Sequence, residues 1–132
     1  MTIVWDGRVT TADWRAHLEE VFDAPDWPPG TRNLTDLRSA DISSITDVDR
    51  ADVVTMYEPH ADKLRGMKSA AVAGDNFDAS RDFESQNEPA GLSLIVFNDL
   101  LNACTWLGVD KAAAQATITE LRQELRAQAA AK

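Results

Sequence analysis

The stretch Leu92-Ser93-Leu94-Ile95-Val96-Phe97 is the clearest strand signal in this 132-residue chain. Its residues are almost all apolar, which is typical of a strand covered by protein on both faces. Parallel sheets have this property, because the connections between their strands run as helices across the faces. The stretch therefore predicts an α/β domain with a mostly parallel sheet.

Two helices are predicted after this strand. Asn98 or Asp99 caps the first helix, and Gly108 ends it. Asp110 caps the second helix, whose apolar residues recur at helical spacing as Ala114, Ile118, Leu121 and Leu125. This stripe must be covered either by the domain's own sheet or by a second copy of the chain.

Extended segments also precede the strand at residues 92–97. The predicted segments cover residues 2–9, 32–37 and 68–73. A short hairpin bent at Gly7 is the alternative for the first segment. Residues 39–44 are polar and are predicted to form a connection.

Three helices are predicted between these extended segments. Thr10 and Thr46 each precede an aspartate by three residues, the spacing of a capping box. The helix after Thr46 reaches Pro59, where it either stops or kinks and resumes, and a strand over residues 53–57 is a further alternative. Asp75 is the predicted cap of the third helix.

The order of these elements predicts one α/β domain with a four- to five-stranded, mostly parallel sheet flanked by helices. The chain length fits a single domain. Residues 1–108 form the predicted domain. Residues 109–132 form an additional C-terminal helix that packs on the domain or on a second copy, so a homodimer is expected.

The charge balance excludes two classes of partner. The net charge is −9, with 13 basic residues scattered among 22 acidic ones. Nucleic acids and anionic membranes attract basic patches, so neither is an expected partner. The single cysteine excludes an intramolecular disulfide, and the sequence shows no secretory signal and no long apolar run. We therefore expect a soluble cytoplasmic protein.

A resemblance to a known family rests on residues in the second half of the chain. They are Lys68-Ser69-Ala70-Ala71-Val72-Ala73, Phe77, Arg81, Phe83, Glu84, Val96-Phe97-Asn98-Asp99, Ala103 and Trp106-Leu107-Gly108. With this order of elements the chain resembles the SpoIIAA-like, STAS-related group of small bacterial α/β proteins. The resemblance covers most of residues 1–108 and its motifs are mostly structural, so it implies the fold more than an activity.

Better-known relatives in that group, the anti-sigma-factor antagonists, are phosphorylated on a serine in an Asp-Ser-Ser/Thr-Gly turn. The corresponding place here reads Ala40-Asp41-Ile42-Ser43-Ser44-Ile45, with an inserted Ile42 and without the glycine. The resemblance makes Ser43 and Ser44 candidate phosphoacceptors. Nearby aspartates repel a phosphate, and serines in a capping loop are the simpler interpretation.

The sequence contains no recognisable catalytic, cofactor or metal pattern. It has no Gly-rich phosphate loop, no nucleophile elbow and no cluster at metal-ligand spacing. Cys104 lies on the apolar face of its helix and is expected to be buried and inert. His17 and Glu20 share a helix face that is expected to be exposed, and His60 is expected to be exposed as well. We therefore expect no enzyme activity, no cofactor and no metal.

Two side chains remain as candidate contacts with a ligand or a partner. Trp27 lies in a Pro-rich loop, where it closes the core, lines a ligand pocket or meets a partner. Arg81 either pairs with an acidic residue on its own surface or holds an anion at the sheet edge.

These observations favour a non-enzymatic regulatory or protein-interaction module of STAS-like type, whose protein partner the sequence does not identify. The alternative is a protein that binds a small lipophilic ligand. Trp5, Trp27 and the aromatic residues of the third helix motivate that alternative.

Overall fold

The computed structural model describes residues 1–24, 30–87 and 93–131 of the chain. Its strands are β1 (Thr2–Arg8), β2 (Arg32–Asp41), β3 (Lys68–Val72) and β4 (Ser93–Phe97). Its α-helices are α1 (Thr11–Asp23), α2 (Asp47–Tyr57), α3 (Ala61–Leu64), α4 (Phe77–Asn87), α5 (Leu100–Leu107) and α6 (Lys111–Ala130). Two 3₁₀ turns, η1 (Glu58–His60) and η2 (Gly74–Asn76), complete the described elements.

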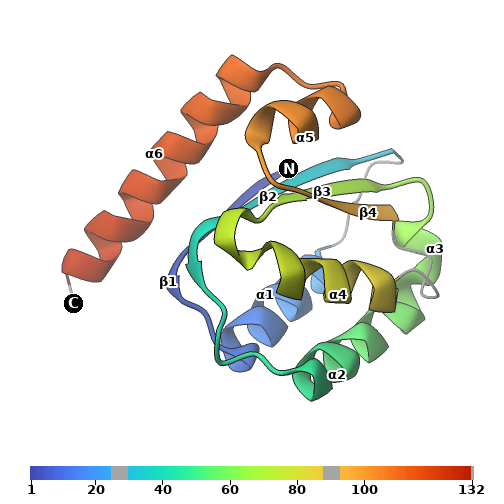
Figure 1. Cartoon of the computed structure of the whole chain (residues 1–132). Coiled ribbons are helices and arrows are strands. Elements are labelled where there is room, and N and C mark those ends of the chain that lie inside the picture. Colours follow the sequence, from blue (N-terminus) through green and yellow to red (C-terminus); the bar gives the residue numbers. More distant parts are fainter. Residues whose placement is uncertain (25–29, 88–92, 132) are drawn as a thin grey trace.

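The four strands form one sheet in the order β1-β2-β3-β4, and every pairing is parallel. Each strand lies beside the next one in sequence, and crossovers between such neighbours have one preferred hand. The connecting helices α1, α2 and α4 therefore share one face of the sheet, and α5 and α6 return across the other (Figure 1). The predicted α/β class with a parallel, helix-flanked sheet and a C-terminal helix is confirmed.

Alternation along the strands divides the buried residues between the two faces of the sheet. Leu34, Ala70 and Val72 pack in one buried cluster with residues of α5 and α6. Ser69 and Ala71 therefore face the layer of α1, α2 and α4. The buried cluster of that layer contains Leu18, Phe22, Val53, Tyr57 and Leu64.

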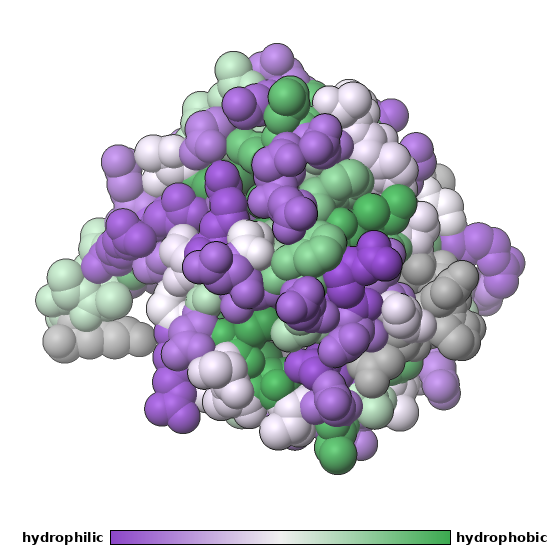
Figure 2. Space-filling model, in the orientation of Figure 1, coloured by the Kyte–Doolittle hydropathy of each residue, from purple (hydrophilic) through white to green (hydrophobic). Residues whose placement is uncertain are grey.

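The surface in Figure 2 is mostly polar, with apolar areas lying between hydrophilic side chains. Among the described residues, the exposed large apolar side chains are Met1, Val48, Leu101, Val109 and Leu125. These residues come from separate segments of the chain rather than from one element.

Most predicted helix caps are confirmed. Thr10 and Thr46 each complete a capping box with the aspartate three residues later. Asp99 and Asp110 each accept a backbone N–H at 2.9 Å. Gly108 ends α5 with a φ of 74°, a left-handed conformation that favours glycine.

Two further predictions about helices are settled by backbone geometry. At Pro59 the chain tightens into η1 and then continues as α3, so the helix kinks and resumes, and a strand over residues 53–57 is wrong. The predicted cap at Asp75 is also wrong, because Asp75 lies inside η2, a turn that precedes α4. The side-chain amide of Asn76 in η2 donates to the carbonyls of Leu37 and Ala40 in β2, and contacts between such distant segments are not visible in local residue spacing.

Strand β2 is longer than predicted. Its residues Ser39, Ala40 and Asp41, which we expected in a connection, pair with Asp6, Gly7 and Arg8 of β1. Strand pairing gives the backbone N–H and C=O groups of these residues hydrogen-bond partners, and this does not depend on whether the side chains are polar. It also rules out the hairpin at Gly7, since β1 continues through that residue in register with β2.

An irregularity interrupts the pairing of β1 with β2. From Val4 to Asp6 strand β1 advances by two residues, while β2 advances from Asp36 to Ser39. Strand β2 therefore contains an extra residue, as in a β-bulge. The backbone N–H of Arg38, within this bulge, donates to Oδ1 of Asp36 at 2.9 Å.

Helix α6 packs on the sheet of its own chain. Ala114 and Ile118 belong to the buried cluster that includes Val4 and Leu34, and Leu121 packs against it from a partly buried position. The apolar stripe thus needs no second copy to cover its first half, and the homodimer stays a prediction. Within the described ranges, no helix is both long enough and apolar enough to span a membrane.

Candidate functional site

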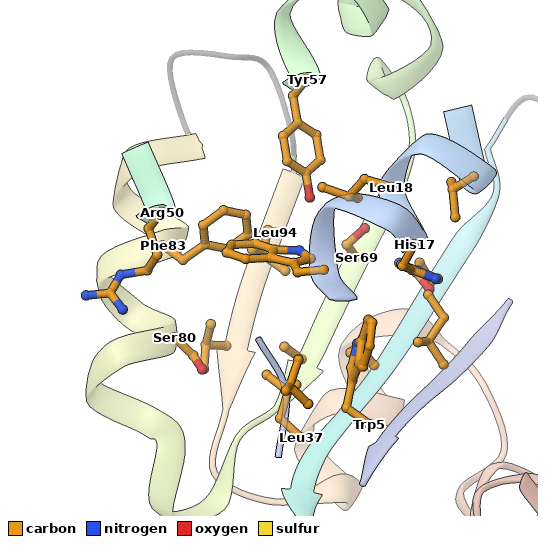
Figure 3. A pocket seen from close by; sticks show the side chains of 18 of the residues that line it. Trp5, His17, Leu18, Leu37, Arg50, Tyr57, Ser69, Ser80, Phe83 and Leu94 are labelled. Carbon is orange, nitrogen blue, oxygen red and sulfur yellow. The ribbon is translucent and has the colours of Figure 1, made fainter. Parts of the chain in front are cut away.

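A cavity of about 170 Å³ lies between the sheet and the layer of α1, α2 and α4. All four strands and all three of these helices contribute to its lining. Figure 3 shows side chains from the sheet and from the helices around this common space. The cavity therefore lies between the two layers and is partly open to solvent, rather than being a cleft at the ends of the strands.

Small residues of the interior strand β3 form the floor of the cavity. Ser69 and Ala71 line it, whereas Ala70 and Val72 lie in the cluster on the opposite face. The neighbouring residues in register are Asn33 and Leu94 beside Ser69, and Thr35 and Val96 beside Ala71. All four neighbours also line the cavity. Small side chains on β3 leave room between this floor and the helices above it.

Aromatic residues of the three helices form the roof. The rings of Trp14 and Phe83 meet edge to face with centroids 4.7 Å apart, and those of Phe22 and Tyr57 do so at 5.5 Å. Burial raises the pKa of Tyr57, against the opposing effect of a hydrogen bond with Trp14, so its hydroxyl stays neutral. Figure 3 shows this hydroxyl directed from the helical layer toward the cavity.

Four polar atoms of cavity-lining residues are buried without a hydrogen-bond partner among the described residues. They are Asn33 Oδ1, Arg50 Nε, Ser69 Oγ and Ser80 Oγ. The residues Ser69, Ser80 and Arg50 are only 4%, 7% and 8% exposed. Buried polar groups in native proteins nearly always have a partner, so such a concentration around one cavity points to a ligand that supplies one.

The positive charge of Arg50 is already matched on its outer side. One terminal nitrogen donates to the carbonyl of Ile45 at 3.1 Å, and the other pairs with Asp47. The carboxylate of Asp82 lies 4.0 Å away. The guanidinium therefore does not demand an anion inside the cavity.

His17 was expected on an exposed helix face, and this expectation is wrong. It is half-buried, lines the cavity, and meets the ring of Trp5 edge to face at 5.2 Å. Burial lowers the pKa of His17, and the charge of Glu20 only partly opposes this effect. The edge strand β1 supplies Trp5, and this contact between elements is invisible in the helical spacing of α1.

His60 is also less exposed than predicted. Its ring stacks on that of Phe22 with centroids 4.2 Å apart and an interplanar angle of 9°. The 3₁₀ turn at Pro59 places it there, beside the roof of the cavity.

The candidate phosphoacceptors lie outside the cavity, in the turn between β2 and α2. Ser43 is exposed, and its hydroxyl donates to Asp41 at 2.6 Å. Ser44 is exposed as well and lies 3.4 Å from the carbonyl of Val9. Their phosphorylation stays a prediction.

The two candidate contact residues are not brought together. Trp27 lies outside the described residues. Arg81 is exposed on α4, where its guanidinium lies 5.9 Å from the ring centroid of Phe77. The anion-binding interpretation of Arg81 stays a prediction.

Cys104 lies on the other side of the sheet, as expected for a structural cysteine. It is 1% exposed and belongs to the cluster beneath α5 and α6. Burial raises the pKa of its thiol, and Asp110 adds to this effect. No group of three or more His, Cys, Asp or Glu side chains placed to hold a metal occurs in the part of the chain that the structure describes.

Comparison with known protein families, with curated proteins and with solved structures finds no match for this chain. The SpoIIAA-like resemblance therefore stays a prediction. The cavity and the residues that line it are therefore the features of this chain that bear on its function.

The sequence alone pointed to only part of this cavity. The sequence indicates Trp5 and the aromatic third helix, whereas it does not single out Asn33 or Ser80, and Ser69 enters only through the family resemblance. The available signal was the run of small residues in a predicted core strand, Ser69-Ala70-Ala71, opposite aromatic helices.

Proposed function

We propose that this protein is a non-enzymatic binding module that holds a small, mainly apolar molecule between its sheet and the layer of α1, α2 and α4. The supporting observation is the cavity of about 170 Å³, with its aromatic roof and its buried unpaired polar atoms. Sites for small molecules are typically concave, mostly apolar and furnished with a few polar groups.

The size of the cavity sets the size of the ligand. An engineered apolar cavity of about 150 Å³ accepts benzene, whereas drug-sized ligands need about 300 Å³ or more. A volume of about 170 Å³ therefore suits a molecule with one ring or a short branched chain.

Energetics favour an occupied cavity over an empty one. At about 24 cal/mol per Å³, a closed cavity of this volume would cost roughly 4 kcal/mol of stability, which is an upper bound for this partly open one. Each buried polar group without a partner costs about 1–3 kcal/mol more. A ligand that fills the space and bonds to these groups recovers part of both costs.

The proposal is tested by measuring the binding of toluene with the full chain. Toluene is expected to raise the melting temperature in a concentration-dependent way, because it binds the folded state alone. The variant Ala71→Leu fills the cavity from its floor and is expected to abolish this shift. Ala116→Leu makes the same change at an exposed site of α6, and this variant is expected to show the same toluene-dependent shift in melting temperature as wild type.

Two results would count against the proposal. One is a melting temperature that toluene does not change in the wild-type protein. The other is an equal response of Ala71→Leu and wild type, which would place toluene elsewhere. The regulatory interaction module of STAS-like type stays the other candidate, and its test is recovery of one reproducible protein partner.

A further inference from the structure

We infer that the ligand of this cavity is a small aromatic alcohol, with its ring beneath the aromatic roof and its hydroxyl between Asn33 and Ser69. The inference rests on the proposed function, which requires only that a small apolar molecule bind. The inference further specifies that the ligand carries a hydroxyl group and that this group binds between Asn33 and Ser69.

The position follows from the register of the sheet. Asn33 of β2 and Ser69 of β3 are direct partners across the two strands, so their side chains stand next to each other on one face. Both residues line the cavity. Asn33 Oδ1 and Ser69 Oγ are each buried, and neither has a hydrogen-bond partner within the described ranges.

The chemistry of the two atoms defines the missing group. An amide oxygen only accepts hydrogen bonds, whereas a serine hydroxyl both donates and accepts. A ligand hydroxyl satisfies the pair at once, because it donates to Asn33 and accepts from Ser69. A bare hydrocarbon leaves both atoms unpaired.

Charge argues for a neutral ligand rather than an acid. The guanidinium of Arg50 already binds the Ile45 carbonyl and Asp47. No other Lys or Arg of the described residues lines the cavity. Two other lining residues carry a basic group: the N-terminal ammonium of Met1 is exposed and donates to the carbonyl of Arg32 at 2.8 Å, and burial lowers the pKa of His17. An ionised carboxylate would therefore lose its hydration without gaining a buried, unmatched positive charge.

The surroundings of this pair suit an aromatic ring. Leu94 is the partner of Ser69 on β4, and Ala71 follows two residues later on the same face. Above them Tyr57 and Phe83 lie with ring centroids 6.1 Å apart. Rings favour edge-to-face or offset contacts with such neighbours.

The test compares phenol with toluene, which have the same number of non-hydrogen atoms and differ in the hydroxyl. Dissociation constants for both are measured by calorimetry with wild type, Ser69→Ala, Ser69→Cys, Ser80→Ala and Ser93→Ala. The quantity of interest is the ratio of the toluene constant to the phenol constant in each protein. Comparing ratios between variants cancels the different hydration of the two compounds.

We expect this ratio to fall about tenfold in Ser69→Ala, the effect of one lost hydrogen bond. Toluene affinity should be retained in that variant. Ser93→Ala is the matched control, because it makes the same change at an exposed residue of β4 that does not line the cavity. Its ratio should equal that of wild type. Ser69→Cys, close in shape to serine but a weak donor, should behave like Ser69→Ala.

An unchanged ratio in Ser69→Ala and Ser69→Cys would overturn this inference while leaving the binding function intact, provided that toluene binds. An equal fall in Ser80→Ala would place the hydroxyl at the other wall and would also overturn it. Failure of both compounds to bind wild type would overturn the proposed function itself.

Discussion

Arg122 of α6 donates a hydrogen bond of 2.6 Å to Oδ2 of Asp36, a carboxylate of β2 that is 0% exposed. The same carboxylate accepts the backbone N–H and the guanidinium of Arg38 from the bulge in β2. Burial alone would raise the pKa of Asp36, but the bonds from Arg38 and the charge of Arg122 hold it below its usual range. The buried carboxylate of Asp36 thus binds both the bulge of β2, through Arg38, and the C-terminal helix, through Arg122.

We expect Asp36→Asn to destabilise the protein by about 3 kcal/mol, because it leaves two arginines beside a buried site without their counter-charge. Urea unfolding at neutral pH measures the loss. The control is Asp62→Asn, which removes an exposed pair with Arg65 and should change stability by no more than about 0.5 kcal/mol. Similar losses in the two variants would contradict the role of Asp36.

Acid should destabilise the protein through His17 before the carboxylates titrate. Burial holds the pKa of His17 below its ordinary value of 6.5 in the folded state. As the pH falls below that value, the unfolded chain binds the proton first, so stability declines. Urea midpoints between pH 7 and pH 5 should therefore fall in wild type and fall less in His17→Gln. Leu18→Val is the control, because it alters the packing of the same helix without removing a titratable group, and it should keep the slope of wild type.

The two faces of β3 should respond differently to added volume. Ala71 borders the cavity, whereas Ala70 is packed against the opposite cluster at 1% exposure. Ala71→Val should change stability by less than about 0.5 kcal/mol or increase it, and Ala70→Val should cost about 1–3 kcal/mol by overpacking. Thermal unfolding of both variants decides the point. Equal losses would show that the space above Ala71 is not available to a side chain.

Removing the hydroxyl of Ser69 should stabilise the ligand-free protein. The hydroxyl is buried and unpaired among the described residues, so Ser69→Ala should raise the free energy of unfolding by about 1 kcal/mol. Chemical denaturation without ligand measures this gain. Thr46→Ala is an opposite control, since loss of a paired cap should cost about 1 kcal/mol. A destabilised Ser69→Ala would mean that the hydroxyl already has a partner.

Much of the fold was predictable because its signals are local. Thr10, Thr46, Asp99 and Asp110 cap helices through atoms within three residues of themselves, and that spacing is written in the chain. Residues 93–97 form a strand, as their continuous apolar character predicts, but the strand lies at the edge of the sheet and only Val96 in it is buried. The full length of β2 was not predictable in this way, because its last residues are held by β1 rather than by their own composition.

The sequence by itself determined the alternation of helices and strands, since capping and periodicity act over one turn or one strand. Only the tertiary structure decided that Asn33 meets Ser69, that His17 meets Trp5, and that Asp36 binds Arg122. These pairs join separate elements, so they depend on strand register and on which face each helix covers. The cavity exists for the same reason: its small floor and aromatic roof become neighbours only when the chain is folded.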